Sequence, residues 1–482
     1  MEPSHFFFGG QGATNASPIS IGVTVLAGLL ILFLRRKYVI WPFMLAGFLI
    51  PFGQVVVVAG LHFQMLRVLM TFGWVKIVWV GVIRKHDEPL FGKPHPVNRA
   101  FVYCAISGAV AFVLSFYVWD AFINQLGGLY NSLGAYFLLL FLIHDEDDVN
   151  RTMRILTVIG GIASVFMVVE QVTKRNVFGL IGGVPLVPDM REGRVRSQAF
   201  FGHSIIAGVF GACLLPLCYC LWLQGGKSKK YAVLGFLAGT VMTVTSGSST
   251  PLMTYLAVFL AFAFWPLRGK MRLVRWGIVL MLIALHIVMH GPVWSLIAHI
   301  DVVGGNSADH RYQLVNQCIL HFKEWWLIGT PDSINWGWDM WDTADTYVSV
   351  AERGGLITLI FFFMILTRAF RSVGKARAAF EGDRKKELYY WSLGAAVFTQ
   401  CVAYFGISYF DQTFLAVDAL LVMVVVLTAN YIAAVAPETA PFPRPGHFNA
   451  IVNRWGRDKG LAPAQRAPNR FGPRGSILPP LK

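Results

Sequence analysis

The stretch SIIAGVFGACLLPLCYCLWL (204–223) runs for twenty residues without a charged side chain. About 17–25 consecutive apolar residues are enough for a helix to cross the hydrocarbon core of a bilayer. A helix also satisfies its backbone polar groups within one segment, as a spanning element must. The stretch is therefore predicted to be a transmembrane helix, which makes this chain an integral membrane protein.

Similar apolar runs recur along the 482 residues, of which 55% are hydrophobic and only 14% are charged. Soluble domains carry about 25% charged residues, so this chain lacks the charge that a soluble surface needs. We predict an all-α, polytopic membrane protein with about thirteen transmembrane helices. The predicted spans are 18–34, 39–59, 64–83, 100–119, 126–143, 153–171, 204–223, 231–247, 250–266, 276–291, 348–369, 388–410 and 412–434.

The basic residues predict the orientation, because Lys and Arg are enriched in cytoplasmic loops. With the N-terminus outside, 31 of the 41 Lys and Arg residues lie inside. This bias explains the net charge of +15 without a nucleic-acid partner. The predicted transmembrane domain is 1–435, and the Pro- and Arg-rich segment 436–482 is a predicted disordered cytoplasmic tail that contacts anionic lipid. Five of the six cysteines lie in apolar runs, which indicates neither a disulfide framework nor a zinc site.

Two outside loops, 172–203 and 292–347, interrupt the predicted spans. The larger one carries six of the fifteen tryptophans beside several carboxylates. Aromatic faces next to acids suit a sugar-binding cleft, since a flat ring covers the C–H face of a pyranose. An aromatic belt at the membrane surface is the alternative explanation. The sugar-binding candidates are Trp336, Trp338, Trp341 and Tyr347.

The large loop also contains a predicted amphipathic surface helix, 310–330, with Arg311 near its start. Arginine offers a planar fork to phosphate oxygens, so Arg311 is a candidate phosphate ligand. An ion pair with Asp309 or Glu324 would explain it equally well. The neighbouring His310 is a further candidate.

The smaller loop holds three basic residues within six positions, Arg191, Arg194 and Arg196. This cluster opposes the positive-inside tendency, so we expect it to bind an anion, either lipid head groups or a substrate diphosphate. His203 follows at the entry to a span, where a structural hydrogen bond is as reasonable as a functional role. The segment SGSST (246–250) is predicted to form a tight connection between spans and is given no catalytic role. Three ionisable residues lie within predicted spans, namely Arg67, His286 and Asp418. Such residues are candidates for a functional role, but hydrogen bonds between helices would explain them equally well.

Three stretches occur in a set order. RVRSQAFFGHSIIAGVFGACLLP (194–216) joins arginines to an aromatic–glycine entry into a span, and HRYQLVNQCILHFKEWWLIGT (310–330) joins an arginine to a closing Leu-Ile-Gly. DTADTYVSVAERGGLITLIFFF (342–363) pairs Asp-Thr-Tyr with Gly-Leu about eight residues later. With a dozen or so spans and one large outer loop, this order resembles the O-antigen polymerase and O-antigen ligase superfamily of bacterial envelope glycosyltransferases, over roughly residues 190–370.

The resemblance implies a glycosyltransferase C-like membrane fold in the bacterial inner membrane, with a periplasmic N-terminus and a cytoplasmic C-terminus. It implies a polyprenyl-diphosphate-linked oligosaccharide as donor, transfer on the outer face, and neither a cofactor nor an obligatory metal. Arg194 or Arg196 would hold the diphosphate together with Arg311, and Arg191 is grouped with them. Charge stabilisation on the leaving group would be the main catalytic contribution. Membrane lipids are further partners, and a chain-length regulator or export machinery is left open.

One position departs from the ligase pattern, because Ala344 stands where ligases typically have a histidine, and the following Asn is Asp345. Asp342 and Asp345 remain as candidate bases, and they would share one face if the segment were helical. The departure favours a polymerase of an envelope or extracellular polysaccharide over a ligase. A lipid-linked oligosaccharide translocase is the alternative from another class. A transporter typically has midplane polar residues and internal repeats, whereas this sequence shows few midplane charges and no internal repeat.

Overall fold

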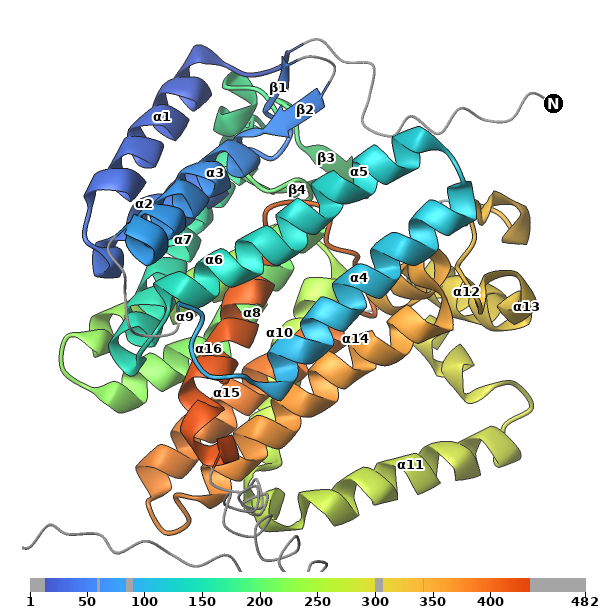
Figure 1. Cartoon of the computed structure of the whole chain (residues 1–482). Coiled ribbons are helices and arrows are strands. Elements are labelled where there is room, and N and C mark those ends of the chain that lie inside the picture. Colours follow the sequence, from blue (N-terminus) through green and yellow to red (C-terminus); the bar gives the residue numbers. More distant parts are fainter. Residues whose placement is uncertain (1–13, 59–60, 84–89, 300–306, 341, 434–482) are drawn as a thin grey trace, which may run out of the picture. The chain divides into compact units, whose positions relative to one another are not determined.

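The computed structural model of the chain (Figure 1) describes residues 14–58, 61–83, 90–299, 307–340 and 342–433. These residues are mostly helical, and seven segments are long and apolar enough to cross a membrane. The prediction of a helical, membrane-embedded chain is therefore confirmed. The seven segments are Pro96–Phe116, Trp119–Leu142, Glu146–Thr173, Ser204–Gln224, Trp265–Val288, Thr346–Ala378 and Phe414–Tyr431.

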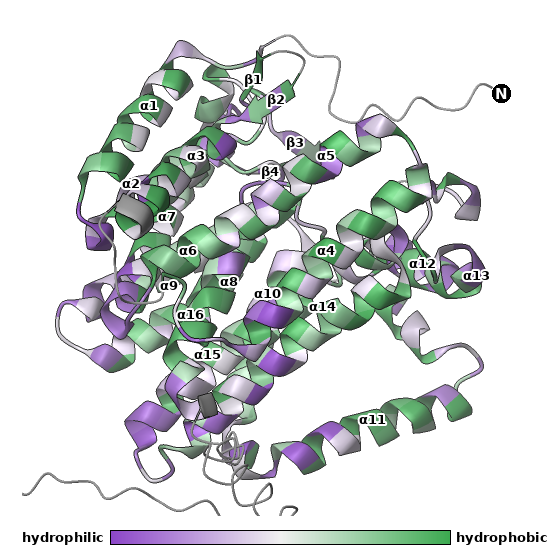
Figure 2. Cartoon of the chain, viewed as in Figure 1, coloured by the Kyte–Doolittle hydropathy of each residue, from purple (hydrophilic) through white to green (hydrophobic). Residues whose placement is uncertain are grey.

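Each of the thirteen predicted ranges contains helix, although several of these helices are shorter than the predicted span. Hydrophobic residues run along the helices, and hydrophilic residues gather at many of their ends (Figure 2). The long helices are α1 (Pro18–Phe33), α2 (Arg36–Leu49), α3 (Met65–Val78), α4 (Pro96–Phe116), α5 (Trp119–Leu129), α6 (Ala135–Leu142), α7 (Glu146–Thr173), α8 (Ser204–Gln224), α9 (Ser228–Thr245), α10 (Ser249–Ala263), α11 (Met271–Val288), α14 (Thr346–Ala378), α15 (Arg384–Ala403) and α16 (Phe414–Ala433). A π-helical turn, Tyr130–Gly134, joins α5 to α6 into one continuous segment, and another, Trp79–Ile83, extends α3.

Helix α8 lies at the centre of the packing and contacts α7, α9, α10 and α15. Small residues permit its close approach to α9, where Gly235 and Gly239 are four positions apart and share one face. A Cβ atom at Gly239 would clash with the carbonyl oxygen of Gly211 on α8. Small residues at such contacts allow the van der Waals packing that holds helices together in lipid.

The predicted span 39–59 is wrong in its second half. Helix α2 ends at Leu49, and the chain turns into a hairpin of β1 (Val55–Val58) and β2 (Leu61–Gln64). Pro51 explains the end of the helix, since a residue that precedes proline is pushed out of the α region. The four valines of β1 favour an extended strand, because β-branched side chains fit a pleated surface.

One further span prediction needs correction, and one span contains a buried lysine. Lys76 on α3 is 7% exposed, and its Nζ donates to the carbonyl oxygens of Leu32 (3.0 Å) and Leu34 (2.6 Å) at the end of α1. The predicted span 388–410 also stops early, at Ala403 of α15. The residues that follow, 404–413, are largely non-helical, and several of them make contacts that are described below.

The two predicted loops have structure of their own. The first contains a short 3-10 helix, Val177–Leu180, and a hairpin of β3 (Asp189–Arg191) and β4 (Arg194–Arg196). The second contains a 3-10 segment, Val293–His299, then α12 (Ser307–Leu320), α13 (Phe322–Trp325) and the turn Ile334–Trp336. The predicted amphipathic helix 310–330 is thus two helices. The predicted tail 436–482 lies outside the described residues.

Candidate functional site

The β3–β4 hairpin fixes the position of Arg196. Its two-residue turn, Glu192-Gly193, has positive φ at both residues (51° and 76°), as a type I′ turn requires. The resulting register places Asp189 directly opposite Arg196. Arg196 Nη1 donates to Asp189 Oδ2 at 2.7 Å, so the hairpin holds its own arginine by an ion pair.

Arg196 extends from the hairpin to the start of α10. Its side chain is buried, and its Nε and Nη2 donate to Ser248 Oγ at 3.3 and 2.9 Å. Ser248 is the N-cap residue of α10. A nearly buried guanidinium that is anchored on two sides is pre-organised, and such a group binds an anion at little entropic cost.

Arg311 reaches the same place from the other loop. It lies near the start of α12, and its Nη2 donates to Thr250 Oγ1 at 2.6 Å. The Thr250 hydroxyl in turn donates to the carbonyl oxygen of Gly406 at 3.3 Å. Glu324, one of the two proposed ion-pair partners of Arg311, instead accepts hydrogen bonds from His321 and Trp336.

The two arginines therefore meet at the first turn of α10, which we call the α10 entry (residues 246–250). Ser248 and Thr250 are two residues apart, so their Cα atoms are separated by at most about 7 Å. The sequence reasoning assigned this segment no role. In the sequence, the hydroxyl residues are the one feature of this segment that points to a polar site. They do not indicate that Arg196 and Arg311 would donate hydrogen bonds to them.

His203 lies beside Arg196. Burial and, to a smaller extent, the positive charge of Arg196 lower the pKa of His203 to about 4, while Asp189 opposes the shift. The neutral ring accepts the backbone N–H of Ile205 through Nδ1 at 3.1 Å and so caps α8. The structural hydrogen bond that the sequence allowed is therefore present.

Arg191 and Arg194 do not contact the α10 entry as Arg196 and Arg311 do. They face each other across the end of the hairpin, and Arg194 is exposed. Neither forms an ion pair with any residue that the structure describes. Like charges in directly opposite positions repel, so this hairpin tip would be stabilised by an anion at the surface.

Asp345 lies close to Arg311. It is the N-cap of α14, and its Oδ1 accepts the backbone N–H of Val348 at 3.0 Å. The side chain is fully buried. Burial raises the pKa of Asp345 to about 6, while the backbone N–H groups of Val348 and Tyr347 and the positive charge of Arg311 oppose the rise.

Asp342 belongs to a separate, more exposed group. Residues 342–345 are not helical, so Asp342 and Asp345 do not share a helix face as the sequence reasoning had allowed. Partial burial raises the pKa of Asp342, His310 lowers it and Asp339 raises it, which indicates that the three side chains are neighbours. His310 Nε2 contacts the backbone carbonyl oxygen of Asp339 at 3.0 Å.

The predicted sugar-binding aromatic residues differ in their surroundings. Trp336 is buried, stacks on His321 and donates its indole N–H to Glu324 Oε2 at 2.8 Å, so its ring is part of the loop core. Tyr347 packs among other aromatic rings and donates its hydroxyl to the Cys401 carbonyl oxygen at 3.0 Å. Trp338 is 86% exposed and presents an open ring. Trp341 lies outside the described residues.

The second and third sequence motifs pack against each other. The N–H of Leu356 donates to the Trp326 carbonyl oxygen at 2.9 Å, and the N–H of Thr330 donates to the Glu352 carbonyl oxygen at 2.6 Å. Gly355 has a φ of 70°, which breaks the regular helix inside α14. A Cβ atom there would lie 2.7 Å from the carbonyl oxygen of Leu327, so glycine is required for this contact.

A hub that the sequence reasoning missed holds these parts together, namely the connection 404–413 between α15 and α16. Gly406 accepts the hydroxyl of Thr250, and the Ser408 hydroxyl donates to the Thr343 carbonyl oxygen. Asp411 Oδ2 accepts the N–H of Gly202 at 2.8 Å. Each contact fixes a segment that bears one of the site residues.

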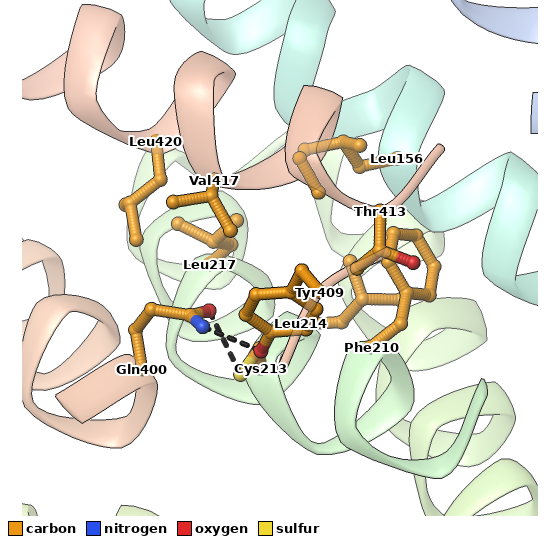
Figure 3. Close-up of a pocket in the computed structure, with 11 residues that line it drawn as sticks. Leu156, Phe210, Cys213, Leu214, Leu217, Gln400, Tyr409, Thr413, Val417 and Leu420 are labelled. Atoms are coloured by element: carbon orange, nitrogen blue, oxygen red, sulfur yellow. Dashed lines mark hydrogen bonds between the residues drawn. The ribbon is translucent and has the colours of Figure 1, made fainter. Parts of the chain in front are cut away.

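Beneath the hub, α7, α8, α15 and α16 enclose a small cavity of about 30 Å³ that is lined mostly by apolar side chains (Figure 3). Gln400 lies between Cys213 and Tyr409, with hydrogen bonds to both. A cavity of this size admits one or two water molecules. It is too small for a substrate.

The described residues contain no group of three or more His, Cys, Asp or Glu side chains that could hold a metal ion. The positive charge of the site comes from Arg196 and Arg311. No protein-family model matches the chain, and no curated protein sequence is significantly similar to it.

Proposed function

We propose that this protein is a glycosyltransferase of the bacterial inner membrane that polymerises polyprenyl-diphosphate-linked oligosaccharide units into an envelope or extracellular polysaccharide. In this proposal about thirteen helices span the membrane in a glycosyltransferase C-like arrangement, with the N-terminus in the periplasm and the C-terminus in the cytoplasm. Residues 174–203 and 289–345 then form the outer face. The sequence resemblance and the arrangement of the arginines support the proposal.

The convergence of Arg196 and Arg311 on the α10 entry carries the proposal. The two residues are far apart in sequence and belong to different loops, yet both donate to hydroxyl groups of one helical turn. Two guanidinium groups beside a helix N-terminus form a strongly anion-attracting environment, because the helix dipole and the cations act in the same sense. A diphosphate matches this arrangement in charge and in its number of acceptor oxygens.

In the proposed reaction, a hydroxyl oxygen of the acceptor sugar attacks the anomeric carbon of the donor. The bond between that carbon and the diphosphate oxygen breaks, and the bonding electrons leave with the diphosphate. Arg196 and Arg311 stabilise the negative charge that develops there, as fixed donors do in a water-poor site. Arg194 and Arg191, at the hairpin tip, attract the anionic donor from the surface.

The hydroxyl proton passes to Asp342, which is exposed and lies beside His310 and Asp339. A raised pKa makes a carboxylate a stronger base than an ordinary aspartate. Asp345 is enclosed and acts on Arg311 rather than on the acceptor, so we assign it a positioning role. The exposed ring of Trp338 offers the stacking surface for a sugar.

The test is a reconstituted assay with a polyprenyl-diphosphate oligosaccharide, in which product length is measured for wild type, Arg311→Ala and Arg194→Ala. A ladder of lengthening chains is expected for wild type. Loss of a single electrostatic donor to a developing anion typically costs 10²–10³-fold in rate, so we expect about that loss for Arg311→Ala. Exposed Arg194 is the matched control, and its loss should cost less than about tenfold.

Three other outcomes would redirect the assignment. Addition of a single glycan to a lipid or protein acceptor would identify a ligase. Movement of the donor between leaflets without a covalent product would identify a translocase and reject the transferase. Equal losses for both arginine variants would reject the α10 entry as the diphosphate site.

A further inference from the structure

A second polar site lies at the opposite ends of the helices that carry the candidate functional site. It is a hollow of about 310 Å³ lined by Trp265, Arg268, Gly382, Arg384 and Glu387. Its volume is at the lower limit of ligand pockets, which measure about 300–1,000 Å³. The 3-10 segment Trp265–Lys270 between α10 and α11 forms one side, and the connection from α14 to α15 forms the other.

Arg268 is fixed in this hollow, which we call the basal pocket. Its Nε donates to Glu387 Oε2 at 2.9 Å, and Glu387 is nearly buried. Its guanidinium lies over the Trp265 ring, 4.3 Å from the ring centroid. Since arginine has five N–H donors, the other four remain for a ligand, because they donate to no side chain or carbonyl that the structure describes.

Arg384 supplies a second cation to the pocket. Its side chain is exposed, and it forms no ion pair within the described ranges. Asp383, its neighbour, instead accepts the backbone N–H groups of Lys385 and Lys386 at the start of α15. Because Glu387 balances Arg268 alone, the pocket lining has a net positive charge.

The surroundings strengthen this charge. Residues 265–275 and 371–387 contain ten Lys and Arg side chains and three acidic ones. Hydrophilic colouring gathers at the end of α14 and the start of α11, whereas the helices between carry apolar residues (Figure 2). A basic pocket with a tryptophan at the ends of apolar helices matches the head-group level of a membrane.

We propose that the basal pocket binds the phosphate group of an anionic phospholipid, with Arg268 and Arg384 as its ligands and Trp265 at the head-group boundary. The inference stands apart from the proposed glycosyl transfer, because the two sites share no residue. A lipid held there would tie the α10–α11 connection to the α14–α15 connection. Soluble phosphate has the same chemistry, so the experiment must separate the two sources.

The test uses the full chain, purified from vesicles of equal parts phosphatidylcholine and phosphatidylglycerol, with retained lipid counted by native mass spectrometry. Wild type should retain phosphatidylglycerol selectively. Arg384→Gln should retain about tenfold less, as expected for one lost charge-assisted contact. Arg371→Gln is the matched control, since it removes the same charge from an exposed α14 position outside the pocket, and it should change retention by no more than about twofold.

Arg268 requires a paired variant, because its removal alone would leave Glu387 buried without a counter-charge. Arg268→Gln combined with Glu387→Gln avoids that penalty and should also reduce retention about tenfold. Equal losses for Arg384→Gln and Arg371→Gln would overturn the proposal in favour of a diffuse attraction. Displacement of the lipid by millimolar inorganic phosphate would assign the pocket to soluble phosphate and overturn the lipid assignment.

Discussion

Asp345 couples the charge of the site to pH. Its pKa of about 6, raised by burial, means that the carboxylate is lost as the pH falls through about 6. Since we propose that the ionised form positions Arg311, the proposed transferase activity is expected to fall over the same range. Asp345→Asn should lower activity and remove this acid limb. The measurement is the rate of product formation between pH 5 and 8 for both proteins.

Stability should show the opposite dependence on pH. The folded-state pKa of Asp345 is above its unfolded value of 3.8, so the group stabilises the fold most when protonated. That contribution is present below about pH 4 and lost as the pH rises through about 6. Asn is also a good N-cap, so Asp345→Asn should keep α14 folded and remove this part of the pH dependence. A limb that persists near pH 6 in the variant would assign the titration to another group.

Among the elements, α14 depends on one glycine for its path. Gly355→Ala would force a Cβ atom onto the Leu327 carbonyl oxygen in a residue whose φ is 70°. We expect destabilisation of about 1–3 kcal/mol, typical of a strained backbone position, because the contact between 326–330 and 352–356 would be lost. The readout is the thermal unfolding midpoint of the purified protein.

Gly374→Ala, later in the same helix, is the control for this variant. A Cβ atom there meets nothing within 4 Å, and alanine favours a helix over glycine by up to about 1 kcal/mol. This variant should be neutral or stabilising. If both substitutions shift the midpoint equally, the packing of the Leu-Ile-Gly motif on α14 is not what requires Gly355.

The positions of the helices could be predicted from the sequence, but their ends and their contacts could not. Apolar runs predicted where helices form, because burial in lipid dominates their free energy. The predicted helix ends are wrong near Pro51 and Ala403. At these positions local backbone preference and tertiary hydrogen bonds outweigh hydropathy. The roles of Ser248 and Thr250 could not be predicted, since they depend on two arginines that only the fold brings to one turn. The burial of Trp336 likewise follows from packing with Leu314 and Val348, which no spacing rule indicates.

For the whole molecule, the proposal requires the candidate site and the basal pocket to lie on opposite sides of a membrane. Helix α8 has 21 residues and so extends roughly 30 Å, the thickness of a hydrocarbon core. Exposed Arg194 precedes this helix and exposed Lys227 follows it. Arg194→Cys and Lys227→Cys therefore report on the two sides.

In intact cells, a membrane-impermeant maleimide should label Arg194→Cys at once, and Lys227→Cys only after the membrane is permeabilised. Wild type provides the background, which should be low because its six cysteines are buried or half-buried. The reverse pattern would place both arginines of the α10 entry in the cytoplasm, where a donor on the outer face could not reach them. Labelling of both variants in intact cells would mean that α8 does not span, and the site would then have to be assigned to one surface.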